Sequence, residues 1–167
     1  LEKARLVFDK SKTMHAFDLA GCIIHEMLGL LGRIEDTDAV VEETIDECLA
    51  FIDEIIEDEE LNPLHKESLF NKLMEEASHR RYNDWDDWRL DLLSSCTMLA
   101  DSPALRIKLD NHLVAMISNE KGDSWSTKHF AEKINLIRYR LIKQYDRPKK
   151  AREFIEQNIK YSRFRKM

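Results

Sequence analysis

The chain has 167 residues, of which 35% are charged and 43% are hydrophobic, and its formal net charge is -6. Four glycines and three prolines are too few for the many turns of a strand-rich protein, so the composition favours an all-α fold. No apolar run approaches the roughly 20 residues that span a bilayer, and the first five residues lack the apolar core of a signal peptide. These features predict a soluble, cytoplasmic protein with no membrane partner.

The length fits one domain, which we predict to span residues 1–167. Because the chain begins with Leu1 instead of Met, we expect this domain to be a fragment of a longer protein. The cysteines lie far apart in apolar stretches, so we expect Cys22, Cys48 and Cys96 to be reduced core residues.

The first predicted helix spans residues 13–32, where apolar residues recur at spacings of three and four. Thr13 suits its N-cap and Gly32 suits the position after its last turn. Gly21 and Gly29 within it each cost about 1 kcal/mol relative to alanine. We therefore expect another helix to approach closely at these two glycines.

The second predicted helix is capped by Thr37 or Asp38 and pairs with the first as an antiparallel hairpin. Its apolar stripe is Val41, Ile45, Cys48, Leu49, Ile52 and Ile56. The third helix opens with Asn62 as N-cap and Pro63 as first helical residue. Its predicted buried face is Leu69, Phe70, Leu73, Met74 and Ala77.

After a turn at residues 82–84, a fourth helix is predicted to reach Ala100. Trp88 aligns with its apolar stripe and is expected in the core, whereas Trp85 and Trp125 are expected to pack at helix entrances. The remaining predicted apolar positions of this helix are Leu92, Cys96 and Leu99.

Three further helices complete the predicted chain. The fifth opens at Ser102 and Pro103, and the sixth begins after Ser126 or Thr127. A break at residues 146–148 precedes the seventh, and residues 161–167 are expected to be irregular. The apolar positions of the seventh helix are Ala151, Phe154, Ile155 and Ile159.

About seven amphipathic helices with short connections predict successive antiparallel hairpins. Helix starts near residues 13, 63, 103 and 148 indicate a loose period of roughly 40 residues, typical of helical-hairpin solenoids. We therefore predict a tetratricopeptide-like α-solenoid superhelix, with a compact helical bundle as the alternative.

The sequence contains no recognisable catalytic motif. It lacks the glycine-rich motifs of dinucleotide and P-loop sites, and its cysteines and histidines lack zinc-ligand spacing. A Glu-x-x-His pair, Glu76 and His79, occurs once, whereas a di-iron bundle needs it on two helices. We predict no enzyme activity, no cofactor and no metal; a metal-dependent helical-bundle enzyme is the least favoured alternative.

Charge is distributed unevenly along the chain. Residues 34–65 contain 13 acidic residues and no Lys or Arg, whereas residues 133–167 contain 12 basic residues and three acidic ones. A local basic patch can bind a partner although the total charge is negative. Our candidate basic partner-binding face consists of Lys133, Arg140, Lys143, Arg147, Lys149 and Lys150. The simpler interpretation is that these residues form a charged surface in contact with solvent and bind no partner.

Residues 141–155 (LIKQYDRPKKAREFI) resemble a tetratricopeptide-like hairpin. Together with residues 82–88 (YNDWDDW) and 158–165 (NIKYSRFR), they resemble the helical-repeat region that accompanies SWIM-type zinc fingers in some bacterial proteins. The resemblance implies that the zinc and any associated nucleic-acid contact belong to an upstream segment, and that this region supplies protein contacts. The finger's Cys and His ligands are absent, so no zinc-binding residue is carried over.

These observations predict a non-enzymatic interaction or scaffold domain that binds a protein or peptide between helix pairs. The alternative is a nucleic-acid-associated module that binds through the basic C-terminal helices. It is motivated by aromatic residues interleaved with the basic ones: Tyr139, Tyr145, Tyr161 and Phe164.

Overall fold

The structure is a computed structural model that describes residues 13–31, 33, 39–57, 61–120, 122 and 124–167. The chain forms two compact units, residues 1–99 (unit 1) and residues 100–167 (unit 2). Over the described residues the regular elements are helices, with no strand, so the predicted all-α class is confirmed. That residues 1–167 form one domain stays a prediction.

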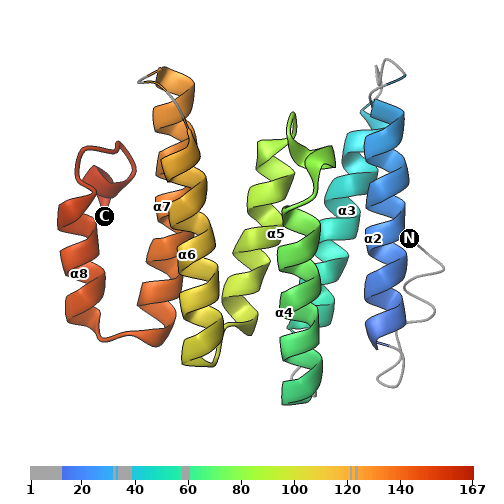
Figure 1. The fold of residues 1–167 in the computed structure, drawn as a ribbon, viewed down its shortest axis with the longest axis horizontal. Coiled ribbons are helices and arrows are strands. Elements are labelled where there is room, and N and C mark those ends of the chain that lie inside the picture. The colour runs from blue at the N-terminus through green and yellow to red at the C-terminus, as the bar shows by residue number, and fades with distance from the viewer. Residues whose placement is uncertain (1–12, 32, 34–38, 58–60, 121, 123) are drawn as a thin grey trace. The chain divides into compact units, whose positions relative to one another are not determined.

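The described residues of unit 1 form two helical hairpins. Its elements are α2 (Thr13–Leu31), α3 (Val40–Ile56), α4 (Pro63–Ala77), the short 3-10 helix η1 (Arg80–Tyr82) and α5 (Asp86–Leu99). Consecutive helices run in opposite directions, so that α2 pairs with α3 and α4 pairs with α5 (Figure 1). Contacts between α3 and α5 join the two hairpins.

The buried faces of α3 and α4 agree with the apolar periodicity of the sequence. All six predicted stripe residues of α3 and all five of α4 are buried. The predicted cap of α4 is also present, because the Asn62 side chain accepts a hydrogen bond of 2.9 Å from the His65 backbone N–H, and Pro63 is the first helical residue.

Two expectations for α2 are wrong. No described atom lies within 4 Å of a Cβ built at Gly21 or Gly29, so none of the described helices approaches closely there. Cys22 is exposed, because it lies two residues from both Ala20 and Ile24 and hence on the opposite side of the helix from the buried stripe. The predicted residue after the helix end, Gly32, lies outside the described residues.

A third finding on α2 concerns the membrane. By length and composition alone, α2 is long and apolar enough to cross a bilayer, contrary to our expectation that no run approaches that length. No other described helix is both as long and as apolar. The core helix of a globular protein can have the same length and hydropathy. In α2, Ala16, Ala20 and Ile24 are completely buried. The helix packs on α3 through one face.

The start of α3 also differs from the prediction. Its N-cap position is Ala39, with a φ of 54° in the left-handed region and no side-chain cap. The predicted caps, Thr37 and Asp38, lie outside the described residues. A left-handed alanine is unfavourable by local sterics, so the backbone preference of Ala39 does not favour this helix start.

Unit 2 contains α6 (Pro103–Asn119), α7 (Trp125–Tyr145), α8 (Pro148–Gln157) and the 3-10 helix η2 (Phe164–Lys166). Helix α7 packs antiparallel to both α6 and α8 (Figure 1). The predicted start of α6 is confirmed, since the Ser102 side chain accepts a hydrogen bond from the Leu105 backbone N–H. The start of α7 lies earlier than predicted, because Ser124 is its N-cap and accepts from the Thr127 backbone N–H at 3.1 Å.

The C-terminal segment, residues 158–167, consists of turns and the short 3-10 helix η2, so the tail predicted to be irregular at residues 161–167 has no regular element longer than η2. Phe164 in η2 is 1% exposed and packs its ring near those of Tyr139, Phe154 and Tyr161. Ile159 lies beyond the end of α8 and is 58% exposed, so its assignment to the buried face was wrong. An aromatic cluster therefore holds this segment in unit 2.

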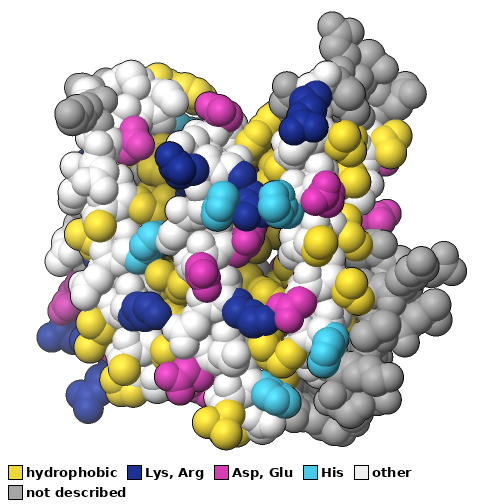
Figure 2. Space-filling model, turned by 45° about the vertical axis from the view of Figure 1, so that its right-hand side comes forward, with side chains coloured by type: hydrophobic (Ala, Val, Ile, Leu, Met, Phe, Trp, Pro, Cys, Tyr) yellow, Lys and Arg dark blue, Asp and Glu magenta, His cyan; other side chains and the backbone are white. Residues whose placement is uncertain are grey.

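The division into units also divides the charge. Unit 1 contains 24 Asp and Glu against 10 Lys and Arg, a formal charge of -14, whereas unit 2 contains 16 Lys and Arg against 8 Asp and Glu, a formal charge of +8. On the face drawn in Figure 2, acidic and basic side chains are interspersed.

Candidate functional site

The predicted basic face lies in unit 2 but is not one continuous helix surface. Lys133, Arg140 and Lys143 are on α7, which ends at Tyr145, so Arg147 belongs to the next turn and not to the side of α7. Lys133 is half-buried, and Arg140, Lys143 and Arg147 are exposed. The α7 and α8 parts of the predicted face therefore belong to different elements.

Two of its lysines are paired with acidic residues. The Nζ of Lys150 lies 2.8 Å from Asp146 Oδ1, and the Nζ of Lys149 lies 3.8 Å from Glu153 Oε1. Such exposed pairs contribute little stability, but they reduce the local positive charge that a partner meets. The positive charge that the α8 part of the basic face presents to a partner is consequently smaller than the sequence suggests.

The aromatic residues interleaved with the basic ones have different environments. Phe164 is buried, and Tyr139 is packed edge-on against it at 6.1 Å between ring centroids. Tyr145 lies beneath the Arg106 guanidinium, 4.9 Å from the ring centroid, and burial, with the charge of Asp101, raises the pKa of its phenol. Of the four tyrosine and phenylalanine side chains, Tyr161 borders a cavity in unit 2.

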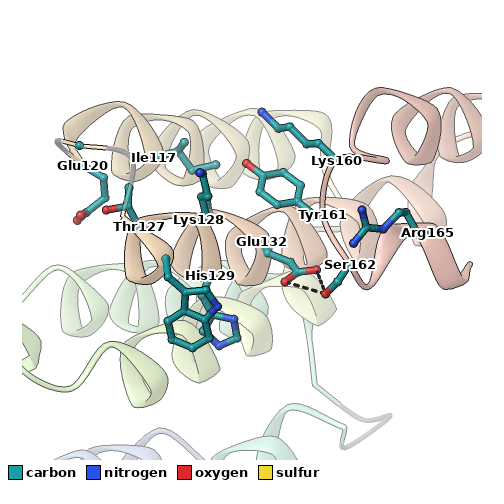
Figure 3. A pocket seen from close by; sticks show the side chains of 13 residues that line it. Ile117, Glu120, Thr127, Lys128, His129, Glu132, Lys160, Tyr161, Ser162 and Arg165 are labelled. Carbon is teal, nitrogen blue, oxygen red and sulfur yellow. Dashed lines mark hydrogen bonds between the residues drawn. The ribbon is translucent and has the colours of Figure 1, made fainter.

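That cavity, which we call the α7 groove, has a volume of about 530 Å³ (Figure 3). Its walls come from the end of α6, the first half of α7 and the C-terminal segment. Its basic and aromatic lining residues are Trp125, Lys128, His129, Lys160, Tyr161 and Arg165. The sequence-based basic face contains none of these six residues.

One buried carboxylate positions the C-terminal wall of the groove. Glu132 on α7 is 7% exposed and accepts hydrogen bonds from the Arg163 backbone N–H at 2.6 Å and from Ser162 Oγ at 3.1 Å (Figure 3). Glu132 therefore fastens the segment that carries Lys160 and Arg165 beside α7. A buried glutamate has no signature in the sequence, because only its tertiary partners distinguish it from an exposed one.

An aromatic stack forms part of the α7 wall. The rings of Trp125 and His129, one helical turn apart, stack with centroids 5.0 Å apart and planes 7° apart. Trp125 is 78% exposed, so the expectation that it packs at the helix entrance is wrong. It instead presents a large aromatic surface to the groove and the solvent.

A second cavity, of about 420 Å³, lies in unit 1 between the start of α3 and the start of α5. We call it the tryptophan pocket. It is lined by Glu42, Asp46, Asp84, Trp85, Asp86, Asp87 and Trp88. Its lining thus combines two indole rings with five carboxyl groups and no basic side chain.

The two tryptophans of this pocket are stacked and oriented. Their ring centroids are 5.1 Å apart with an angle of 29° between planes, and Trp88 Nε1 donates a hydrogen bond of 2.8 Å to Asp46 Oδ1. Trp85 and Trp88 are half-buried, so the core position predicted for Trp88 is only partly realised. Their indole surface remains partly open to a ligand.

Arg89 supports the turn that carries this pocket. Its Nη2 donates to Asn83 Oδ1 at 2.9 Å, and its Nη1 lies 3.4 Å from Asp86 Oδ1. The guanidinium thereby ties the segment before α5 to the first turn of that helix. Its Nε is buried with no hydrogen-bond partner in the described part of the chain, and Arg89 does not line the pocket.

The residues of the single Glu-x-x-His pair make protein contacts. Glu76 Oε1 accepts a hydrogen bond of 2.8 Å from the Tyr82 hydroxyl, and His79 Nδ1 accepts from the Nε of Arg81 at 3.0 Å. Tyr82 is fully buried, and burial, followed by the charge of Glu76, raises the pKa of its phenol. Among the described residues, no group of three or more His, Cys, Asp or Glu is placed to hold a metal ion.

Comparison with known protein families, with curated proteins and with solved structures finds no match to this chain. The proposals about function below therefore rest on the lining residues and geometry of the α7 groove and the tryptophan pocket. The resemblance to helical regions that accompany SWIM-type zinc fingers stays a prediction.

Proposed function

We propose that the chain is a non-enzymatic protein-interaction domain that binds a cationic segment of a partner protein in the tryptophan pocket. The observation that carries this proposal is the stacked pair of Trp85 and Trp88 within a lining of five carboxyl groups. The proposal includes a cytoplasmic location and a tetratricopeptide-like succession of hairpins. The antiparallel pairs α2–α3 and α4–α5 support that arrangement within unit 1.

The pocket combines two attractions for a cation. An Arg or Lys over an indole face gains about 0.5–1 kcal/mol when exposed and about 2 kcal/mol or more when desolvated. The surrounding carboxylates add a charge-assisted hydrogen-bond partner, and arginine fits both roles because its guanidinium is planar and stacks on aromatic rings. An arginine side chain of a peptide is therefore the favoured occupant.

Preorganisation favours this binding. The hydrogen bond from Trp88 to Asp46 fixes the indole before a ligand arrives, so less side-chain entropy is lost on binding. The charge of -14 on unit 1 attracts cationic partners over distances of about a Debye length, ~8–10 Å at physiological salt. Association should consequently be faster at low ionic strength.

The test is a calorimetric titration of the protein with a short arginine-rich peptide. The substitution Trp85→Ala is expected to weaken binding about tenfold, because it removes one face of the stacked pair. The pair of substitutions Asp84→Asn and Asp87→Asn should weaken it further and reduce its salt dependence.

The matched control is Trp125→Ala, which removes an exposed tryptophan from unit 2 and should leave peptide binding unchanged. An acidic peptide of the same length should not bind to the tryptophan pocket. Equal peptide affinity for the wild type and Trp85→Ala would refute the proposed site, provided that circular dichroism shows both proteins folded.

A further inference from the structure

We infer that the α7 groove of unit 2 binds single-stranded nucleic acid. The groove and the tryptophan pocket lie in different units and share no residue, so this inference stands independently of the proposed protein-binding function. It also differs from the predicted basic face, none of whose six residues lines the groove.

Charge is the first argument. Three cationic side chains line the groove: Lys128 from α7, and Lys160 and Arg165 from the C-terminal segment (Figure 3). Of the two acidic lining residues, Glu132 already accepts hydrogen bonds from Ser162 and Arg163, whereas Glu120 is exposed. With three cations against two carboxylates, the lining has a formal charge of +1 within a unit of charge +8, which suits a phosphate backbone.

Aromatic surface is the second argument. Trp125 is 78% exposed and is stiffened by its stack on His129, and Tyr161 lies elsewhere in the lining with Lys160 Nζ 5.0 Å from its ring centroid. Base stacking on such rings contributes about 1–3 kcal/mol per base and needs no particular sequence. Lys160, beside the Tyr161 ring, is placed to meet the phosphate of a nucleotide stacked on that ring.

These two features together favour a single strand over other anions. In a duplex the base faces are already stacked on each other, so they are not available to Trp125. An acidic peptide would use the cations but leave the exposed indole without a flat partner. The cavity volume of about 530 Å³ also falls within the range of sites that hold molecules of nucleotide size.

The test is fluorescence anisotropy of a labelled oligodeoxythymidine strand titrated with the full chain at about 50 and 200 mM salt. The double variant Lys160→Glu/Arg165→Glu should lose more than tenfold in affinity and show a shallower salt dependence. Trp125→Ala should lose about fivefold or more with the salt dependence unchanged, because it removes stacking and no charge.

The matched control is Lys149→Glu/Arg152→Glu, the same charge change on α8 outside the groove. We expect it to lose less than threefold, and we expect duplex DNA, inorganic polyphosphate and adenosine monophosphate to compete poorly. The inference is overturned if the α8 variant loses as much as the groove variant, if Trp125→Ala binds like the wild type, or if any of the three competitors matches the single strand. Circular dichroism of each variant verifies that it is folded.

Discussion

At the residue scale, Asp53 on α3 shows how burial couples one carboxyl group to folding. Burial raises its pKa, while the hydrogen bond that Ser95 Oγ donates to Asp53 Oδ1 at 2.5 Å lowers it. The net shift is upward from the ordinary value of 3.8, so the folded protein holds a proton on Asp53 to a higher pH than the unfolded chain does. Its contribution to stability therefore falls as the pH rises from 3.8 through the folded-state pKa.

The substitution Asp53→Asn keeps an oxygen that accepts from Ser95 and removes the buried charge. We expect the free energy of unfolding at neutral pH to rise by a few tenths to about 1 kcal/mol, a figure discounted because the side chain is only half-buried. Well below pH 3.8, where Asp53 is protonated in both the folded and the unfolded chain, the variant and the wild type should be similarly stable. Urea denaturation across this pH range measures the difference.

The control is Glu47→Gln, which removes an exposed carboxyl group of the same helix. It should change the free energy of unfolding by less than about 0.5 kcal/mol. A loss of stability in Asp53→Asn at neutral pH would contradict the account, because it would mean that the ionised carboxylate is the more favourable form.

Local chemistry made some residues predictable and tertiary contacts decided the others. Asn62 and Ser102 were recognised as caps because a cap with a following proline depends on a few adjacent residues. The environments of Trp88 and Trp125 were not predicted correctly, since helical spacing alone does not show how much of an indole a neighbouring element covers. Both candidate cavities depend on such tryptophans.

At the element scale, the link between Glu132 and the C-terminal segment builds the α7 groove. The segment follows α8 without a further long helix, and its ordering depends on the buried Phe164 ring and on two hydrogen bonds to one carboxylate. A charge-assisted bond from a backbone N–H to a buried carboxylate contributes about 1.5–3 kcal/mol.

The substitution Glu132→Ala tests this link. We expect the Arg163 amide to lose its protection against hydrogen exchange, and the free energy of unfolding to fall by about 1–3 kcal/mol. Nucleic-acid binding should weaken as well, although removal of a carboxylate makes the groove more positive. Glu156→Ala, at an exposed position of α8, should change neither property.

Retention of Arg163 amide protection in Glu132→Ala would contradict the proposed role of this carboxylate. Tighter nucleic-acid binding by the same variant would show that charge alone, and not the placement of the C-terminal segment, controls the groove.

Helix boundaries also illustrate what the sequence leaves open. Ser124, Ser126 and Thr127 are three competing cap residues near the start of α7, and cap chemistry alone does not rank them. Gly21 and Gly29 failed as markers of close packing because a helix tolerates glycine on an open face at a modest cost. Periodicity was sufficient for α3 and α4, whose apolar stripes are wide and regular.

At the scale of the whole molecule, two units of opposite charge carry the two candidate sites. The acidic run at residues 34–65 and the basic run at residues 133–167 were visible in the sequence. The boundary between Leu99 and Ala100 was not visible, because the cap and proline at Ser102 resemble those at Asn62 within unit 1. The charges of -14 and +8 emerge only when the chain is divided at that boundary.

The most direct measurement is a nuclear magnetic resonance titration that follows the three indole N–H signals, assigned by single Trp→Phe variants. We predict that an arginine-rich peptide shifts the signals of Trp85 and Trp88 and leaves that of Trp125 in place. A thymidine oligonucleotide should shift only Trp125. If the peptide leaves both signals of the tryptophan pocket unchanged, or shifts Trp125 equally, the central claim that this pocket of unit 1 selects cationic partners is wrong.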